Sequence, residues 1–218
     1  MSSFMLKCIA MLTMLIDHVG FVLFPEQMIW RIIGRVAFPL FAFLIVQGVL
    51  HTSNWKRYGI RLLLFAFLSE IPFDLATSGQ WVNFYSQNIF FTLLFGMLVV
   101  EASIYFEAQG KVVYGFGLAF VIGFLCDIFR TDYGMLGILL IYSFYMCRYS
   151  KMATATMTIV LNFVEGTPQL FAGLAVIPIY FYNGTLGLKN KWIQYGFYAF
   201  YPVHLLILAA IAGRIPMF

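Results

Sequence analysis

Long apolar runs, separated by short polar joints, follow one another along almost the whole chain. Nine such runs cover residues 4–24, 37–50, 58–76, 88–106, 112–129, 134–147, 152–164, 167–182 and 192–212. A helix needs about 20 residues to cross a bilayer. The pattern therefore predicts an all-α, polytopic integral membrane bundle of about eight or nine transmembrane helices. The stretch 152–182 leaves the count open, because it fits two short helices or one long broken helix.

Composition leaves little room for anything but this bundle. Of the 218 residues, 62% are hydrophobic and 10% are charged, whereas a soluble domain is nearer half apolar and a quarter charged. We therefore expect a single membrane domain over residues 1–218, whose chemistry uses side chains inside the bundle or at its two faces. The net charge of +4 comes from scattered basic residues, which suits a membrane surface better than nucleic acid.

The positions of the charges predict an orientation, with the N-terminus in the cytoplasm. This orientation places nine of the thirteen Lys and Arg residues inside: Lys7, Lys56, Arg57, Arg61, Lys111, Arg148, Lys151, Lys189 and Lys191. Seven of the nine acids then lie toward the outer face: Asp17, Glu26, Glu70, Asp74, Asp127, Asp132 and Glu165. Nine crossings would place the C-terminus outside, and an even count would place it inside.

Polar residues within the apolar runs need a partner or a wet cavity, because each costs roughly 2.5 to 3.5 kcal/mol near the bilayer centre. Asp17 is expected to meet Arg31 or Arg35, which are i,i+4 neighbours. Such an ion pair could simply pin two helices together. That explanation leaves His18, which points into an adjacent groove, unexplained. His18 and His204 share the bundle, and a neutral imidazole is well suited to take a proton at pH 7.

Two further polar pairs lie toward the predicted outer face. Glu70 and Asp74 share one helical face and require a cation, which an arginine or a cationic ligand could supply. A metal site is disfavoured, because no His or Asp ligand spacing accompanies them. Gln87 and Asn88 open the fourth run, where their amides could hydrogen-bond a carbonyl or thioester oxygen, or Asn88 could cap the helix.

A basic cluster is expected at the inner side, around the turn between the second and third runs. Its members are Gln47, His51, Lys56, Arg57 and Arg61. Ordinary positive-inside anchoring accounts for such a cluster. A cofactor that carries phosphate and approaches from the cytoplasm would also meet it first.

The chain resembles a known family in several motifs that occur in the same order. These motifs are residues 16–20 (Ile-Asp-His-Val-Gly), 34–43 (Gly-Arg-Val-Ala-Phe-Pro-Leu-Phe-Ala-Phe), His51-Thr52, 69–74 (Ser-Glu-Ile-Pro-Phe-Asp), 87–93 (Gln-Asn-Ile-Phe-Phe-Thr-Leu) and 200–205 (Phe-Tyr-Pro-Val-His-Leu). Together they resemble the TraX family over nearly the whole chain. One departure is Gln47, where the family often has Glu, so a negative charge has no role at that position here.

The resemblance implies an acyltransferase of the bacterial inner (plasma) membrane. The named member of the family acetylates the N-terminus of conjugative F pilin. By similarity, the family is related to transmembrane acyltransferases such as heparan-α-glucosaminide N-acetyltransferase and the acyltransferase-3 group. The implied donor is acetyl-CoA, and the implied acceptor is an amine or hydroxyl of a pilin, peptide or cell-envelope glycan at the extracytoplasmic face.

The residues can be assigned roles in this reaction. His18 is the expected general base, Asp17 sets the polarity around it, and His204 or Asn88 donates to the developing oxyanion. Glu70, Asp74 and Gln87 are expected to bind the acceptor. The donor is expected to meet the basic residues Arg31, Arg35, His51, Lys56, Arg57 and Arg61.

Two other function classes fit the same pattern. A small proton-coupled transporter or flippase also uses intramembrane Asp, Glu and His residues. An assembly scaffold could use buried charges only to fix helix packing. Dependence on acyl-CoA distinguishes the three, because only the acyltransferase should bind or hydrolyse it.

Overall fold

The computed structural model describes residues 1–164, 166–188 and 190–216. Throughout these residues the regular elements are helices, apart from one isolated β-bridge between Gln87 and Thr131. The predicted all-α class is therefore confirmed. Glu165 and Lys189, which enter the orientation argument, lie outside the described residues, as does the side chain of Lys191.

Ten α-helices and one 3-10 helix make up the described chain. They are α1 (Ser3–Leu23), α2 (Met28–Gly34), α3 (Ala37–His51), α4 (Trp55–Ser78), α5 (Ile89–Ala108), α6 (Val112–Ile128), α7 (Gly134–Met146), α8 (Lys151–Val164), η1 (Gln169–Ala175), α9 (Val176–Tyr180) and α10 (Lys191–Ile211).

Eight of the nine predicted runs each hold one helix whose ends lie within three residues of the expected bounds. The run 167–182 is divided between η1 and α9, so the stretch after α8 contains short elements rather than one long helix. The short helix α2 was not predicted.

Among the described residues, four segments are long and apolar enough to cross a membrane: Ser3–Leu23, Met28–His51, Ile89–Ala108 and Trp192–Ile211. The second of these joins α2 to α3. Helix α4 has 24 residues, but it carries Lys56, Arg57 and Arg61 near one end and Glu70 and Asp74 near the other. The described chain thus has the helices of a membrane protein.

The described residues form two compact units, each built from separate stretches of sequence. The first unit contains residues 1–41, 67–83 and 158–218, and the second contains residues 42–66 and 84–157.

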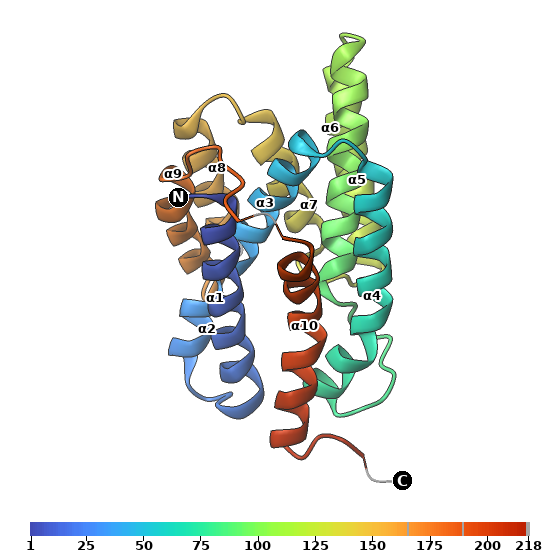
Figure 1. Ribbon diagram of the computed structural model, residues 1–218, viewed down its shortest axis with the longest axis vertical. Helices are drawn as coiled ribbons and strands as arrows, with labels where there is room; N and C mark the ends of the chain where they lie inside the picture. The colour runs from blue at the N-terminus through green and yellow to red at the C-terminus, as the bar shows by residue number, and fades with distance from the viewer. Residues whose placement is uncertain (165, 189, 217–218) are drawn as a thin grey trace. The chain divides into compact units, whose positions relative to one another are not determined.

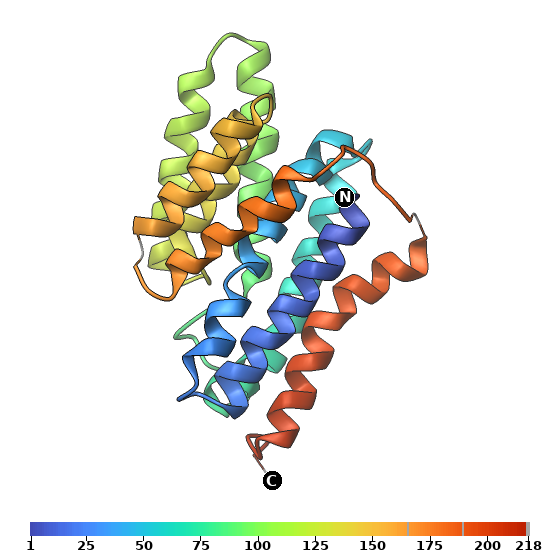
Figure 2. The same ribbon diagram turned by 90° about the vertical axis from the view of Figure 1, so that its left-hand side faces the viewer.

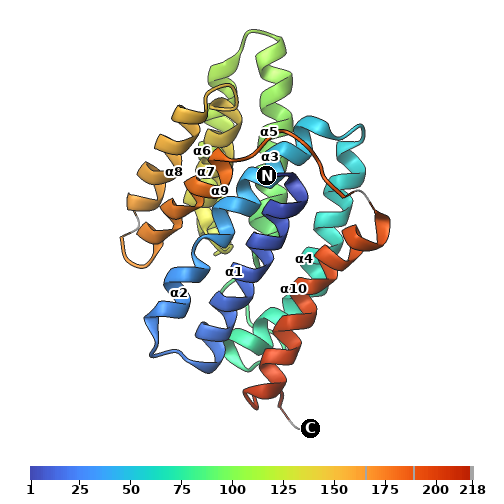
Figure 3. The same cartoon turned by 60° about the vertical axis from the view of Figure 1, so that its left-hand side comes forward.

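In the first unit, α1 packs against α2 and α10 (Figure 3). Two glycines allow the close approach of α1 and α2. A Cβ atom added at Gly34 would lie 2.2 Å from Cβ of Asp17, and one added at Gly20 would lie 2.2 Å from Cβ of Trp30. Helix α10 bends along its length (Figure 2) and contains Pro202, which removes a backbone hydrogen bond inside the helix.

In the second unit, α5, α6 and α7 pack side by side (Figure 1). Helix α6 turns a row of small buried residues, Gly115, Ala119 and Gly123, toward its neighbours. A Cβ atom at Gly115 would lie 2.8 Å from Oγ of Ser103 on α5, and one at Gly123 would lie 3.0 Å from Cγ of Met135 on α7. Small residues at such positions let membrane helices approach closely.

Candidate functional site

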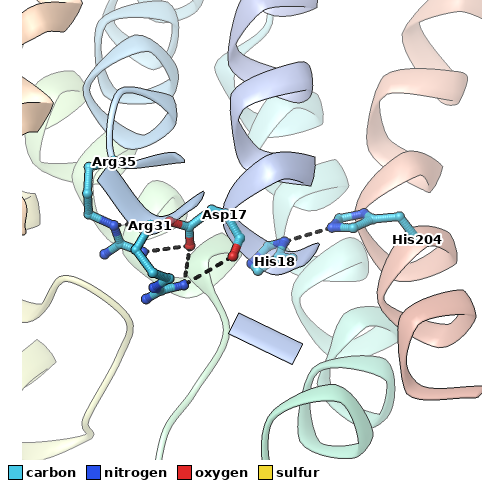
Figure 4. Close-up of polar contacts among 5 residues, drawn as sticks. All are labelled: Asp17, His18, Arg31, Arg35 and His204. Atoms are coloured by element: carbon cyan, nitrogen blue, oxygen red, sulfur yellow. Dashed lines mark hydrogen bonds and ion pairs between the residues drawn. The ribbon is translucent and has the colours of Figure 1, made fainter. Parts of the chain in front are cut away.

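Two histidines from distant parts of the sequence meet in the first unit. His18 lies on α1 and His204 on α10, with Nδ1 of His18 2.7 Å from Nε2 of His204 (Figure 4). Their rings are stacked, with centroids 4.9 Å apart. The two histidines, which were expected to share the bundle, are thus in direct contact.

The hydrogen bonds around the pair fix the position of each proton when both rings are neutral. Nδ1 of His204 lies 2.7 Å from the carbonyl oxygen of Phe200. A carbonyl only accepts, so this Nδ1 carries the proton and Nε2 of His204 has a lone pair. His18 must then donate its Nδ1 proton to that lone pair. Nε2 of His18 is left with a lone pair, and no described residue forms a hydrogen bond to it.

Aromatic side chains enclose the pair. The ring of Tyr201 makes edge contacts with His18 at 5.8 Å and with His204 at 5.7 Å between centroids. Phe200 stacks on His204 at 4.8 Å. His204 is 5% exposed, whereas His18 is half-buried. His18 is thus the more exposed residue of the pair.

Asp17 on α1 binds two arginines (Figure 4). Arg31 lies in α2, and Arg35 directly follows α2. Oδ2 of Asp17 lies 2.5 Å from Nη1 of Arg31 and 2.6 Å from Nη2 of Arg35, and Oδ1 accepts from Nε of Arg35 at 3.2 Å. Asp17 was expected to meet one of these arginines, and it meets both. The three groups together carry one net positive charge, close to the helix that bears His18.

Asp17 does not hydrogen-bond to His18 within the part of the chain that the structure describes. Consecutive helical residues point about 100° apart. The carboxylate therefore serves the arginines on one side of α1, while the imidazole faces α10 on the other.

Glu70 and Asp74 lie on α4, in the first unit. Asp74 is 1% exposed, and its Oδ2 accepts a hydrogen bond from the backbone of Asn83 at 2.8 Å. No cationic side chain among the described residues pairs with Asp74. It therefore does not hold Arg31 or Arg35 in place.

Arg214, which was not singled out from the sequence, ties helix ends together in the first unit. Its guanidinium donates to the carbonyl of Ala76 near the end of α4 and to that of Val22 near the end of α1, the latter at 3.5 Å. The residue follows α10 and lies half-buried. The only sequence signal for it is a lone arginine after a long apolar helix.

Asn88 and Gln87 belong to the second unit, where both have structural partners. Asn88 caps α5: Oδ1 accepts from the backbone of Phe90 at 3.0 Å, and Nδ2 donates to the carbonyl of Ala66 at 2.8 Å. The backbone of Gln87 pairs with Arg130 and Asp132, both at 2.9 Å. The capping interpretation of Asn88 is thus the arrangement observed.

The basic residues that were expected at the inner side gather where α3 ends and α4 begins, also in the second unit. His51, Lys56 and Arg57 are exposed, and Arg61 is half-buried. Nδ1 of His51 lies 2.8 Å from the carbonyl oxygen of Gln47, the other member of the expected cluster. Among the described residues there is no group of three or more His, Cys, Asp or Glu side chains that could hold a metal ion.

Comparison with known proteins adds a family. The family model described as "TraX protein" matches residues 2–212. The chain is 29% identical over 238 residues to the probable fimbrial assembly protein FimC, serogroup H1, of Dichelobacter nodosus, a match that covers 96% of this chain and 95% of that protein. It is also 29% identical over 96 residues to an uncharacterized protein of Rickettsia prowazekii (strain Madrid E), covering 44% of this chain and 35% of that protein. No solved structure matches the chain.

Proposed function

Since the chain belongs to the TraX family, we propose that it is an integral membrane acyltransferase that uses acetyl-CoA to acetylate an amine or a hydroxyl. The proposed setting is the bacterial inner membrane, crossed eight or nine times from a cytoplasmic N-terminus. The donor would approach from the cytoplasm, and the acceptor would react at the extracytoplasmic face. The similarity to a probable fimbrial assembly protein favours a pilin or other envelope polymer as the acceptor.

The observation that carries the proposal is the lone pair on Nε2 of His18. The bond to His204 orients the imidazole and places its one N–H proton on Nδ1, which donates to Nε2 of His204. A neutral imidazole with one nitrogen free of hydrogen bonds to the described residues has the geometry that a general base needs. Such a base typically contributes about 10² to 10⁴ in rate.

The proposed reaction uses this nitrogen twice. The acceptor attacks the thioester carbonyl carbon as its proton moves to Nε2 of His18. The C–S bond then breaks, the acetyl group stays on the acceptor, and the same proton moves to the departing sulfur. His18 is neutral again, and free CoA leaves with its thiol intact.

Two positively charged arginines against one carboxylate give the site a net positive field. Arg31 and Arg35 are held by Asp17, so they are ordered before any substrate arrives. A preorganised positive charge stabilises the oxyanion that forms on the thioester carbonyl, and it is the contribution that we assign to these three residues. His204 supports the base, while Asn88 is assigned only its capping role. The acceptor would be bound by the α4 acids Glu70 and Asp74.

The same hydrogen bonds favour an acyltransferase over a proton-coupled transporter. The chain that begins at Nε2 of His18 ends at the carbonyl of Phe200, which has no proton to pass on. A proton taken up by His18 must leave by the same atom. A base that later acts as an acid requires this arrangement, whereas a transmembrane proton pathway requires two open ends.

The test is acyl-CoA turnover by the purified protein in nanodiscs, followed as release of free thiol. We expect saturable release in the wild type, a loss of about 10² or more in His18→Ala, and a smaller loss in His204→Ala, which keeps the base but removes its orienting partner. Thr13→Ala is the matched control on α1, because the Thr13 hydroxyl bonds only to carbonyls of its own helix, at 2.9 and 3.1 Å.

Full turnover in a folded His18→Ala variant would exclude the base assignment. Binding of acetyl-CoA is measured on the same samples, because release could depend on an acceptor that is absent from the assay. If the wild type neither binds nor cleaves acetyl-CoA, the acyltransferase proposal is wrong.

A further inference from the structure

Five arginines of the described chain are half-buried, and four of them have acceptors in the protein. Arg31 and Arg35 bind Asp17, Arg148 binds Glu107 at 2.7 Å, and Arg214 binds backbone carbonyls. The fifth is Arg61. Its Nε is buried and has no hydrogen-bond partner among the described residues, and its guanidinium lies 5.6 Å from the ring centre of Tyr58.

The surroundings of Arg61 concentrate positive charge. Helix α4 begins at Trp55 and has no acidic residue in its first turn, although the positive end of a helix favours acids and disfavours bases. Lys56 and Arg57 occupy this turn, and Oδ1 of Asn54 caps it by accepting from the backbone of Arg57 at 2.9 Å. These charges repel the helix dipole, so helix stability does not explain why they are there.

No acid of the second unit compensates Arg61. Glu107 binds Arg148 and Tyr145. Met97 of α5 packs against Gly59 of α4. Glu101 lies one helical turn after Met97, so it lies beside the first turn of α4. It forms no ion pair within the described ranges. The exposed charges of Lys56 and Arg57 suit positive-inside anchoring. That rule does not account for a half-buried guanidinium with a buried Nε about 6 to 7.5 Å further along the helix.

We propose that Arg61 is the centre of a phosphate-binding site, with Lys56, Arg57 and His51 at its rim. A guanidinium binds phosphate through paired, charge-assisted hydrogen bonds, and a bound phosphate would satisfy the buried Nε. This inference deepens the proposed function, because the phosphate could belong to the nucleotide head of acyl-CoA. The same chemistry also fits the phosphodiester of an anionic lipid.

The experiment measures binding without turnover, on wild type, Arg61→Gln, Arg61→Lys and Lys111→Gln in nanodiscs. The probes are CoA, 3′-dephospho-CoA and phosphate-free pantetheine in phosphatidylcholine discs, and a second set of discs contains phosphatidylglycerol. We expect CoA to bind wild type, and Arg61→Gln to weaken that binding by about tenfold or more with little effect on pantetheine. Arg61→Lys should keep part of the affinity. Lys111→Gln changes an exposed lysine at the turn between α5 and α6 and should keep all of it.

The two lipid compositions separate the two sources of phosphate. In one outcome, wild type does not bind CoA, phosphatidylglycerol raises its thermal unfolding midpoint, and only the Arg61 variants lose that increase. This outcome supports the phosphate site and excludes acyl-CoA as its ligand. If Arg61→Gln binds CoA and responds to phosphatidylglycerol as wild type does, this inference is overturned. Thiol release that persists in that variant with an unchanged KM would then leave the proposed function intact. Because Arg61→Gln could misfold, its size-exclusion profile must match wild type, and otherwise Arg61→Lys decides.

Discussion

At the scale of single residues, two neighbouring residues of α1 place a carboxylate and an imidazole on different sides of the helix. Asp17 points to α2 and holds two arginines, while His18 points to α10 and bonds to His204. An ion cluster and a neutral imidazole pair therefore lie side by side without a hydrogen bond between them. In the proposed mechanism, the cluster supplies positive charge to the site and the pair supplies a proton acceptor.

Asp17→Asn should destabilise the protein more than any other single change of an acid in the first unit. Asp17 is 6% exposed and is the counterion of two half-buried arginines. Its replacement leaves both cations without a counterion, at a cost of about 3 kcal/mol. The measurement is the thermal or denaturant unfolding midpoint in detergent. Glu26→Gln removes an exposed carboxylate and should leave the midpoint unchanged; equal midpoints for the two variants would contradict the argument.

The sequence contained part of this site. Ionisable groups inside apolar runs must find partners, and that rule was enough to predict that Asp17 meets Arg31 or Arg35 and that the two histidines share the bundle. It could not predict the bond between His18 and His204, because the relative rotation of α1 and α10 depends on packing across the unit. For the same reason the contacts of Tyr201, and the helix ends that Arg214 joins, had no signal in spacing or composition.

At the scale of helices, glycines set the distances that the site requires. Gly34 is the last residue of α2, and the atoms nearest to a Cβ added there are Cβ, Oδ1 and Cα of Asp17, at 2.2, 2.3 and 2.5 Å. The absence of a side chain is therefore what lets α2 approach α1 closely enough for both arginines to reach one carboxylate.

Gly34→Ala should separate α1 from α2 and weaken both ion pairs. Overpacking of this kind costs about 1 to 3 kcal/mol, and because Asp17 must move we also expect turnover to fall. Gly117→Ala is the matched control: Gly117 lies in α6 with nothing within 4 Å of the added Cβ, so the change should be neutral or stabilising by up to about 1 kcal/mol. Unfolding midpoints and thiol release for the two variants test this prediction. An unchanged midpoint in Gly34→Ala would show that α1 and α2 can accommodate a methyl group between them.

The positions of the long helices were predictable from the sequence, whereas the short helix α2 was not. Asn88 caps α5, as the sequence allowed, and eight of the nine predicted apolar runs each hold one helix. Met28–Gly34 is only seven residues long and contains Arg31, so its apolar run is too short and too charged to be recognised. Its helical form depends on packing against α1 rather than on its own pattern.

At the scale of the whole molecule, the site makes sense only with a defined orientation in the membrane. Donor and acceptor must arrive from opposite faces if the donor is a cytoplasmic thioester and the acceptor belongs to the envelope. The basic first turn of α4 would then face the donor, and the last turns of the same helix, with Glu70 and Asp74, would face the acceptor. Whether the N-terminus lies in the cytoplasm or outside therefore decides whether donor and acceptor can bind at these faces.

Cysteine labelling tests that orientation directly. The three native thiols, Cys8, Cys126 and Cys147, are free, so each is first replaced by Ala or Ser, and a single cysteine is then placed in an exposed turn. A cytoplasmic N-terminus predicts that α5 runs inward, so that Gln80→Cys, before α5, reacts with an impermeant maleimide in spheroplasts. Lys111→Cys, after α5, should react only once the cells are opened; both positions are exposed. Reversed labelling would place the basic turn outside, where no acyl-CoA reaches it, and would refute the assignment of donor and acceptor faces, while leaving the chemistry of the histidine pair open to a direct assay.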